Sequence, residues 1–136
     1  MLGFIRPRVS METILLVDDN PLRAAMRQSL LERSGPPVLR VLDAAEALCM
    51  VESPDVAQSL ALVVTGHSMT GIPGPEFVAE LRSRMPRVPV LVLSSLVGFE
   101  KEYQGISDIY FSQTHSPEDL RASVVRLIGI GQRQTA

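Results

Sequence analysis

The sequence predicts a single α/β domain, a three-layer sandwich in which a five-stranded parallel sheet lies between helices. Five short apolar runs alternate along the 136 residues with segments of helical periodicity. The runs are continuous rather than alternately apolar and polar, as expected of strands covered on both faces. Right-handed crossovers between parallel strands then place helices on both sides of the sheet. The length and the 46% hydrophobic content fit one domain with a full core.

The five predicted strands are apolar throughout and end in polar or glycine-rich loops. They cover residues 14–17, 38–42, 60–64, 90–93 and 109–111. The carboxyl ends of parallel strands meet at one edge of the sheet, where open α/β sheets bind their ligands. The residues that follow each strand are therefore the first candidates for a functional site.

The first predicted helix begins at a clear capping signal. Asn20 followed by Pro21 reads as an N-cap with proline at the first helical position. Behind it Leu22, Met26 and Leu30 repeat every four residues. This spacing predicts an amphipathic helix whose apolar face packs on the sheet.

The other helices carry similar signals. Asp43 and Glu46 resemble a capping box. Pro75 opens a third helix and Pro117 the last one, which Gly129 is expected to end. Their apolar stripes are Val78, Leu81 and Met85 in the third, and Leu120, Val124, Leu127 and Ile128 in the last. The segment 96–107 has only a short polar middle, so its fourth helix is predicted to be short or frayed.

Composition restricts the class of protein. The net charge is −2 and the basic residues are scattered, so no nucleic-acid partner is expected. The apolar run 88–93 is far shorter than the ~18 residues of a membrane span, so we expect a cytoplasmic protein. Cys49 is the single cysteine and is expected in the core. Residues 1–11 are predicted to be a loosely ordered extension, 12–130 the domain and 131–136 a tail.

Two adjacent carboxylates, Asp18 and Asp19, follow the first strand. Paired carboxylates at a strand end commonly hold a hard cation such as Mg²⁺. In the alternative interpretation, Asp19 and Asn20 only cap the following helix.

Further motifs follow in chain order. Residues 69–74 read Met-Thr-Gly-Ile-Pro-Gly, the strand 90–93 runs into Ser94, and Tyr110 precedes Gln113 by three residues. With the acidic pair, these motifs resemble the CheY-like receiver domain of response regulators over about residues 12–130. The resemblance implies a flavodoxin-like (βα)5 fold and a role in two-component signal transduction. It places the phosphoacceptor at Gly66, three residues before Met69.

The departures from the family pattern point to the function. The resemblance assigns the switch positions to Ser94 and Tyr110, while Gln113 replaces the lysine and Thr114 the proline. Gly66 has no side chain on which an acyl phosphate could form. Two carboxylates and a neutral amide carry the same formal charge as the family's site, which suggests a coordinated loss. Mg²⁺ is not required, and Asp18 and Asp19 are expected to bind it weakly at most.

We therefore expect an atypical stand-alone receiver, not an enzyme, that acts by phosphorylation-independent protein–protein interaction. Its expected partner is a sensor kinase or another signalling protein, and a homodimer is left open. One alternative is a conventional phosphoreceiver inactivated by substitution at Gly66. A second is a small-ligand-binding flavodoxin-like domain. Substitute phosphorylation at Thr65, His67, Ser68 or Ser94 is not expected, and His67 is taken to be an exposed loop residue.

Overall fold

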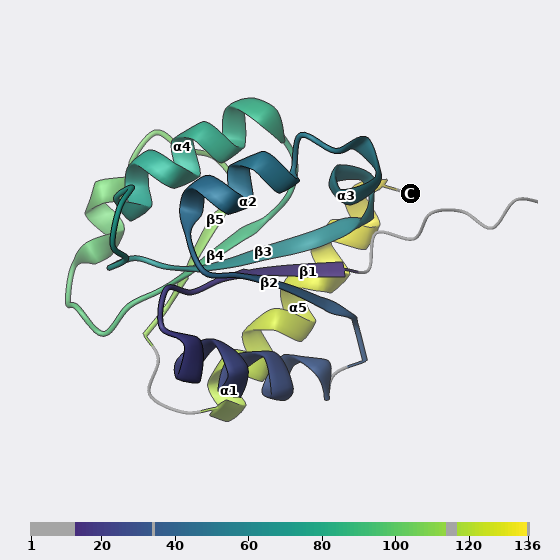
Figure 1. Cartoon of the computed structure of the whole chain (residues 1–136), viewed down its shortest axis with the longest axis horizontal. Helices are drawn as coiled ribbons and strands as arrows, with labels where there is room; N and C mark the ends of the chain where they lie inside the picture. Colours follow the sequence, from purple (N-terminus) through teal and green to yellow (C-terminus); the bar gives the residue numbers. More distant parts are fainter. Residues whose placement is uncertain (1–12, 34, 114–116, 136) are drawn as a thin grey trace, which may run out of the picture.

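The computed structural model of the chain describes residues 13–33, 35–113 and 117–135. Its centre is a five-stranded parallel sheet in the order β2-β1-β3-β4-β5 (Figure 1). The strands are β1 (Thr13–Val17), β2 (Val38–Val41), β3 (Leu60–Gly66), β4 (Val90–Leu93) and β5 (Ile109–Ser112). Each was predicted within two residues of its ends. The predicted three-layer α/β sandwich is confirmed.

Helices cover both faces of the sheet (Figure 1). They are α1 (Pro21–Glu32), α2 (Ala44–Met50), α3 (Pro54–Ser59), α4 (Gly74–Arg84), the 3-10 helix η1 (Phe99–Tyr103) and α5 (Pro117–Thr135). Helices α2 and α4 lie on one face, and α1 and α5 lie on the other. No helix in the described part of the chain is long and apolar enough to cross a membrane.

Three helical features test the sequence predictions. The short fourth helix is confirmed as η1, a single 3-10 segment of five residues. Helix α3 was not predicted, although Ser53 before Pro54 is the same kind of start signal as Asn20 before Pro21. The prediction that Gly129 ends the last helix is wrong, because α5 continues to Thr135 and takes in most of the predicted tail. The predicted extension 1–11 lies outside the described residues.

The core forms two layers because side chains alternate along each buried strand. Leu15 and Val63 face the layer under α2 and α4, whereas Leu16 and Val64 face the layer under α1 and α5. All seven residues of β3 are buried. The carboxyl end of this central strand is therefore held rigidly, and the residues that follow it start from a fixed position.

The prediction for the buried face of α1 is wrong at Leu22 and Met26, whereas Leu30 packs against the core layer under α1 and α5. Leu22 and Met26 are 80% and 73% exposed. The buried residues are Ala24 and Leu31, and Arg27 lies between them on the same side with a side chain only 15% exposed. The repeat of larger apolar residues indicated the wrong side because a cation, rather than a leucine, occupies the middle of the inner face.

The prediction that Cys49 is a core residue is also wrong, because its side chain is exposed. Helix α2 turns Ala44, Ala47 and Val51 inward, at spacings of three and four residues. Cys49 falls between two of these positions, so the helix carries it to the outer side.

Candidate functional site

Strand register brings the predicted site residues to one edge of the sheet. Val17 pairs with Thr65, Gly66 pairs with Leu93, and Leu93 pairs with Ser112. Asp18, Ser94 and Gln113 are the next residues after β1, β4 and β5. They therefore lie at the same edge as Gly66, as predicted from the ends of the strands.

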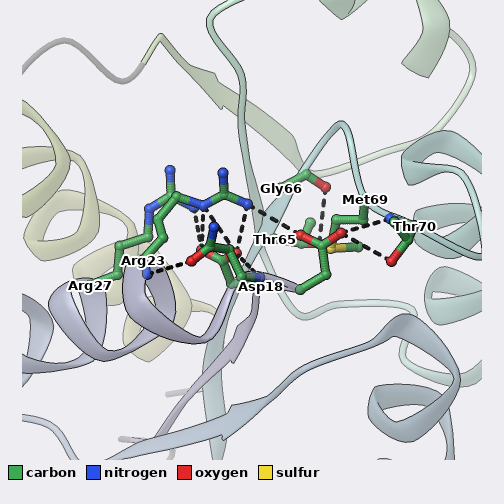
Figure 2. Close-up of polar contacts among 9 residues, drawn as sticks. Asp18, Arg23, Arg27, Thr65, Gly66, Met69 and Thr70 are labelled. Atoms are coloured by element: carbon green, nitrogen blue, oxygen red, sulfur yellow. Dashed lines mark hydrogen bonds and ion pairs between the residues drawn. The ribbon is translucent and has the colours of Figure 1, made fainter.

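Asp18 is fully buried and its carboxylate is surrounded by donors. Its Oδ1 accepts from the Asn20 backbone N at 3.0 Å and from Arg23 Nη2 at 2.7 Å. The Arg23 Nε lies 3.0 and 2.9 Å from the two carboxylate oxygens. Arg27 Nη1 donates to Oδ2 at 2.7 Å. Two guanidinium groups from α1 thus hold one buried carboxylate (Figure 2).

Asp19 joins the same network from the other side. Its Oδ2 accepts from the backbone N and the hydroxyl of Thr70, at 2.8 and 3.1 Å. Its Oδ1 lies 3.3 Å from Arg23 Nη2, the atom that also contacts Asp18. Arg23 therefore bridges the two carboxylates, and Asp19 ties α1 to the loop between β3 and α4. Asp19 does not cap α1; the Asn20 side chain does so, accepting from the Arg23 backbone N at 2.9 Å.

The arginines set the charge of the acidic pair. Burial by itself would raise the pKa of Asp18, but hydrogen bonds from Arg23 and from the Asn20 backbone, with the charge of Arg27, lower it below its ordinary value. The hydrogen bond to Asp18 raises the pKa of Arg23. Burial lowers the pKa of Arg27 although Asp18 opposes the shift, and the guanidinium remains protonated at neutral pH. The formal charge of the site counted from the sequence left out both arginines. When they are included, the two carboxylates and the two guanidinium groups sum to zero.

Gly66 closes β3 beside this network, with the side chain of Met69 against it. A Cβ placed on Gly66 would meet Met69 Cγ at 3.4 Å, an ordinary contact. The Thr65 hydroxyl is buried, donates to the Gly66 carbonyl at 3.3 Å and lies 3.8 Å from Met69 Sδ. The Met69 side chain thus lies beside Gly66, in the space where a small-ligand-binding domain would hold its ligand.

The prediction for His67 is wrong, because the residue is buried rather than exposed. Strand β3 runs two residues further than predicted, and the His67 backbone N continues the ladder by donating to the Leu93 carbonyl at 2.9 Å. The ring lies between two partners, with Nδ1 2.7 Å from Tyr103 Oη and Nε2 3.1 Å from Glu102 Oε2. His67 therefore links the end of β3 to η1.

Tyr103 completes this link above the start of α4. Burial, with a smaller effect of Glu102, raises the pKa of Tyr103 far above its ordinary value, so the phenol keeps its proton at neutral pH. A Cβ on Gly74 would meet Tyr103 Oη and would lie 2.8 Å from the His67 carbonyl oxygen. Glycine at position 74 is thus required by the close approach of His67 and Tyr103.

The remaining predicted positions lie on β4 and β5. Ser94 is mostly buried, and its Oγ accepts from the Leu96 backbone N at 3.1 Å. Tyr110 is half-buried and packs against the core layer under α1 and α5. Gln113 is exposed, and Thr114 lies outside the described residues.

Known proteins share both this sequence pattern and this fold. A family model, the response regulator receiver domain, matches residues 14–107. The chain belongs to this family. It is accordingly a receiver domain of two-component signalling, with the CheY-like fold that the resemblance implied.

Two curated relatives support the assignment. The receiver is 31% identical over 115 residues to the uncharacterized transcriptional regulatory protein YrkP of Bacillus subtilis, covering 82% of this chain and 47% of that protein. It is 30% identical over 95 residues to a gliding motility regulatory protein of Myxococcus xanthus, covering 68% of this chain and 12% of that protein. The chain thus spans less than half the length of either relative.

One solved receiver is described with a bound metal. The receiver domain of a sensor histidine kinase from Pseudomonas aeruginosa is described with magnesium coordinated in its active-site cleft. It is 24% identical, with a TM-score of 0.73 over 87% of this chain and 98% of that one. In the present receiver, donors of the chain itself engage both carboxylates of the acidic pair. No group of three His, Cys, Asp or Glu side chains that could hold a metal occurs within the described residues. This arrangement does not fit Mg²⁺.

Sequence reasoning missed the residues that give this receiver its particular site. Arg23 and Arg27 are four residues apart, so they share one side of α1. They also follow the acidic pair within nine residues, and this spacing was the available signal. Tyr103 carried no comparable signal, because its partner His67 is 36 residues away in the sequence.

Proposed function

We propose that this receiver works without phosphorylation and signals by binding another protein of a two-component pathway, such as a sensor kinase. The observation that carries the proposal is Gly66 itself. It ends β3 at the site edge, beside the acidic pair, and offers only backbone atoms there. Phosphoryl transfer to a receiver needs a carboxylate nucleophile and cations that neutralise the phosphoryl oxygens. Here the position lacks the carboxylate.

Three of the four neighbouring nucleophiles, all but Ser68, are poor substitutes because each is already engaged. The Thr65 hydroxyl is buried against Gly66 and Met69, and both ring nitrogens of His67 have partners in η1. The Ser94 hydroxyl accepts from the Leu96 backbone N. A phosphoryl group on any of them would have to break these contacts. We therefore propose no substitute acceptor and no enzymatic activity.

Direct phosphorylation tests this proposal. The protein is incubated with acetyl phosphate and Mg²⁺, and its intact mass is measured before and after hydroxylamine treatment. We expect no stoichiometric gain of a phosphoryl group. A stoichiometric, hydroxylamine-labile adduct would refute the proposal, and so would a phosphoryl group mapped to Thr65, His67, Ser68 or Ser94. A conventional CheY-like receiver treated in parallel shows that the reagent is active.

The alternative of a conventional phosphoreceiver inactivated at one position makes a different prediction. Gly66 has no positive φ, and a Cβ there meets only Met69 at an ordinary distance, so Gly66→Asp is expected to fold. If substitution at position 66 were the only change, Gly66→Asp would be phosphorylated by acetyl phosphate. We expect it to remain unmodified, because the arginine-bound acidic pair and Gln113 also differ from a conventional site.

A further inference from the structure

We infer that Arg23 and Arg27 stand in for the divalent cation at the acidic pair, and that removing them would expose a cation site that the native protein lacks. This inference concerns metal binding at Asp18 and Asp19. It does not depend on whether the receiver is phosphorylated.

Arg23 occupies the bridging position between the two carboxylates. Its Nη2 lies 2.7 Å from Asp18 Oδ1 and 3.3 Å from Asp19 Oδ1, so one cationic group contacts both side chains (Figure 2). Mg²⁺ in proteins is typically bound through one or two carboxylates together with several waters. The guanidinium therefore lies where the two carboxylates would otherwise converge on a metal ion.

Arg27 closes the buried side of the same carboxylate. Its side chain is 15% exposed, and its Nη1 lies 2.7 Å from Asp18 Oδ2. Arg27 lies on the same side of α1 as the buried Ala24 and Leu31, so moving it away from Asp18 would leave a largely buried guanidinium without this partner. The exposed part of the network is Arg23, whose side chain is 43% exposed.

Charge opposes a metal ion in this arrangement. Two guanidinium groups already neutralise two carboxylates, so a divalent cation would add two uncompensated charges to a site that contains a fully buried aspartate. Such a net charge is costly to hold away from water. The metal must therefore displace the arginines, which at Arg27 would break a buried ion pair.

The arginine network also connects three elements without a metal. Arg23 and Arg27 belong to α1, Asp18 and Asp19 follow β1, and Thr70 lies in the loop between β3 and α4. The contacts from Arg23 through Asp19 to the Thr70 backbone N fix this loop relative to α1. The loop that starts at Gly66 is thus positioned by side chains of the chain itself.

The experiment titrates Mn²⁺, a paramagnetic substitute for Mg²⁺, into the wild-type protein and the double variant Arg23→Met/Arg27→Met. Free Mn²⁺ is followed by electron paramagnetic resonance, and Mg²⁺ is added as a competitor. Methionine keeps an unbranched apolar side chain at each position. The triple variant that adds Asp18→Asn is the control for site-specific binding.

We expect no saturable Mn²⁺ binding by the wild-type protein at low millimolar concentrations. The double variant should bind at least about tenfold more tightly, because two positive charges next to the ligands are removed. This binding should be competed by Mg²⁺ and lost in the triple variant.

Saturable, Mg²⁺-competed binding by the wild-type protein would overturn the inference. A folded double variant that binds no more tightly than wild type would do the same. If the double variant does not fold, Arg23→Met decides by the same criteria, because it vacates the bridging position and leaves the buried Arg27 in place. Failure of this inference leaves the mass measurement of phosphorylation unaffected, so the two proposals fail separately.

Discussion

Replacing Arg27 with methionine would show how strongly the arginine network stabilises the fold. The substitution keeps most of the apolar stem, on the side of α1 that carries Ala24 and Leu31, and removes the guanidinium 2.7 Å from Asp18 Oδ2. Breaking a buried ion pair by removing one partner costs about 3–5 kcal/mol. Asp18 keeps Arg23 and the Asn20 backbone N, so the expected loss of unfolding free energy is nearer about 2–3 kcal/mol.

The matched control is Arg84→Met. Arg84 also pairs with a carboxylate at 2.8 Å, but this pair with Glu80 lies on the surface of α4 with side chains 34% and 55% exposed. Exposed pairs at this spacing contribute only about 0.3–0.5 kcal/mol, because water and salt screen the charges. Arg84→Met also removes a hydrogen bond to the Glu80 carbonyl and a longer ion pair with Glu52 at 3.8 Å, but these contacts are on the surface, so the difference between the two variants reflects the burial of the Arg27 pair.

Urea unfolding followed by circular dichroism measures both variants. With a slope of about 1–3 kcal/mol/M, Arg27→Met should lower the midpoint by roughly 0.7–3 M, and Arg84→Met should leave it nearly unchanged. A double-mutant cycle with Asp18→Asn then separates the pair from the rest of the network. If Arg27→Met destabilised the protein no more than Arg84→Met does, the arginine would not be a structural cation and this reasoning would be refuted.

Three further predictions concern other parts of the site. The pKa of Asp18 is lower in the folded state than its ordinary 3.8, so its contribution to stability is full at neutral pH and is lost as the pH falls below about 4. Because Arg27 helps to lower this pKa, the urea midpoint of Arg27→Met should fall less steeply from pH 7 downward than that of the wild-type protein. Gly74→Ala should cost roughly 1–3 kcal/mol in urea unfolding, because its Cβ meets Tyr103 and His67, whereas Gly66→Ala should cost less. Cys49 should react completely with a thiol reagent in the native protein, and a buried, unreactive thiol would contradict its exposed position.

The sheet could be predicted from the sequence because its signal is local. A strand buried on both faces needs a continuous apolar run, and the runs around residues 14–17 and 60–64 show this directly. The inner face of α1 could not be predicted in the same way. Its middle position is Arg27, which is buried only because Asp18 lies opposite it in the fold. A tertiary ion pair of this kind reverses the apparent amphipathic pattern of Leu22 and Met26.

The candidate site was predictable in its positions and not in its contacts. The motifs located Asp18, Asp19 and Gly66, and the strand register brings the acidic pair and Gly66 to one edge. Some partners lie close in the sequence, as Arg23 and Arg27 do for Asp18, and others come from elsewhere in the fold, as His67 shows by contacting Tyr103 in η1. The sequence around His67 looked like a loop. Its imidazole is buried only because β3 is longer than predicted and η1 lies against it.

The arginine network explains why Gly66 and the acidic pair are better treated as one feature than as separate losses. In a conventional receiver, a metal ion and a lysine offset the charge of several carboxylates and of the incoming phosphoryl group. Here the positive charge belongs to α1, is held on Asp18 and leaves the pair formally neutral without a metal ion. A carboxylate restored at position 66 would lie at the same sheet edge as an acidic pair that Arg23, a fixed cation, already bridges, in place of a metal that can also bind phosphoryl oxygens. We therefore expect phosphorylation to return only when the arginines and Gln113 are changed together with Gly66.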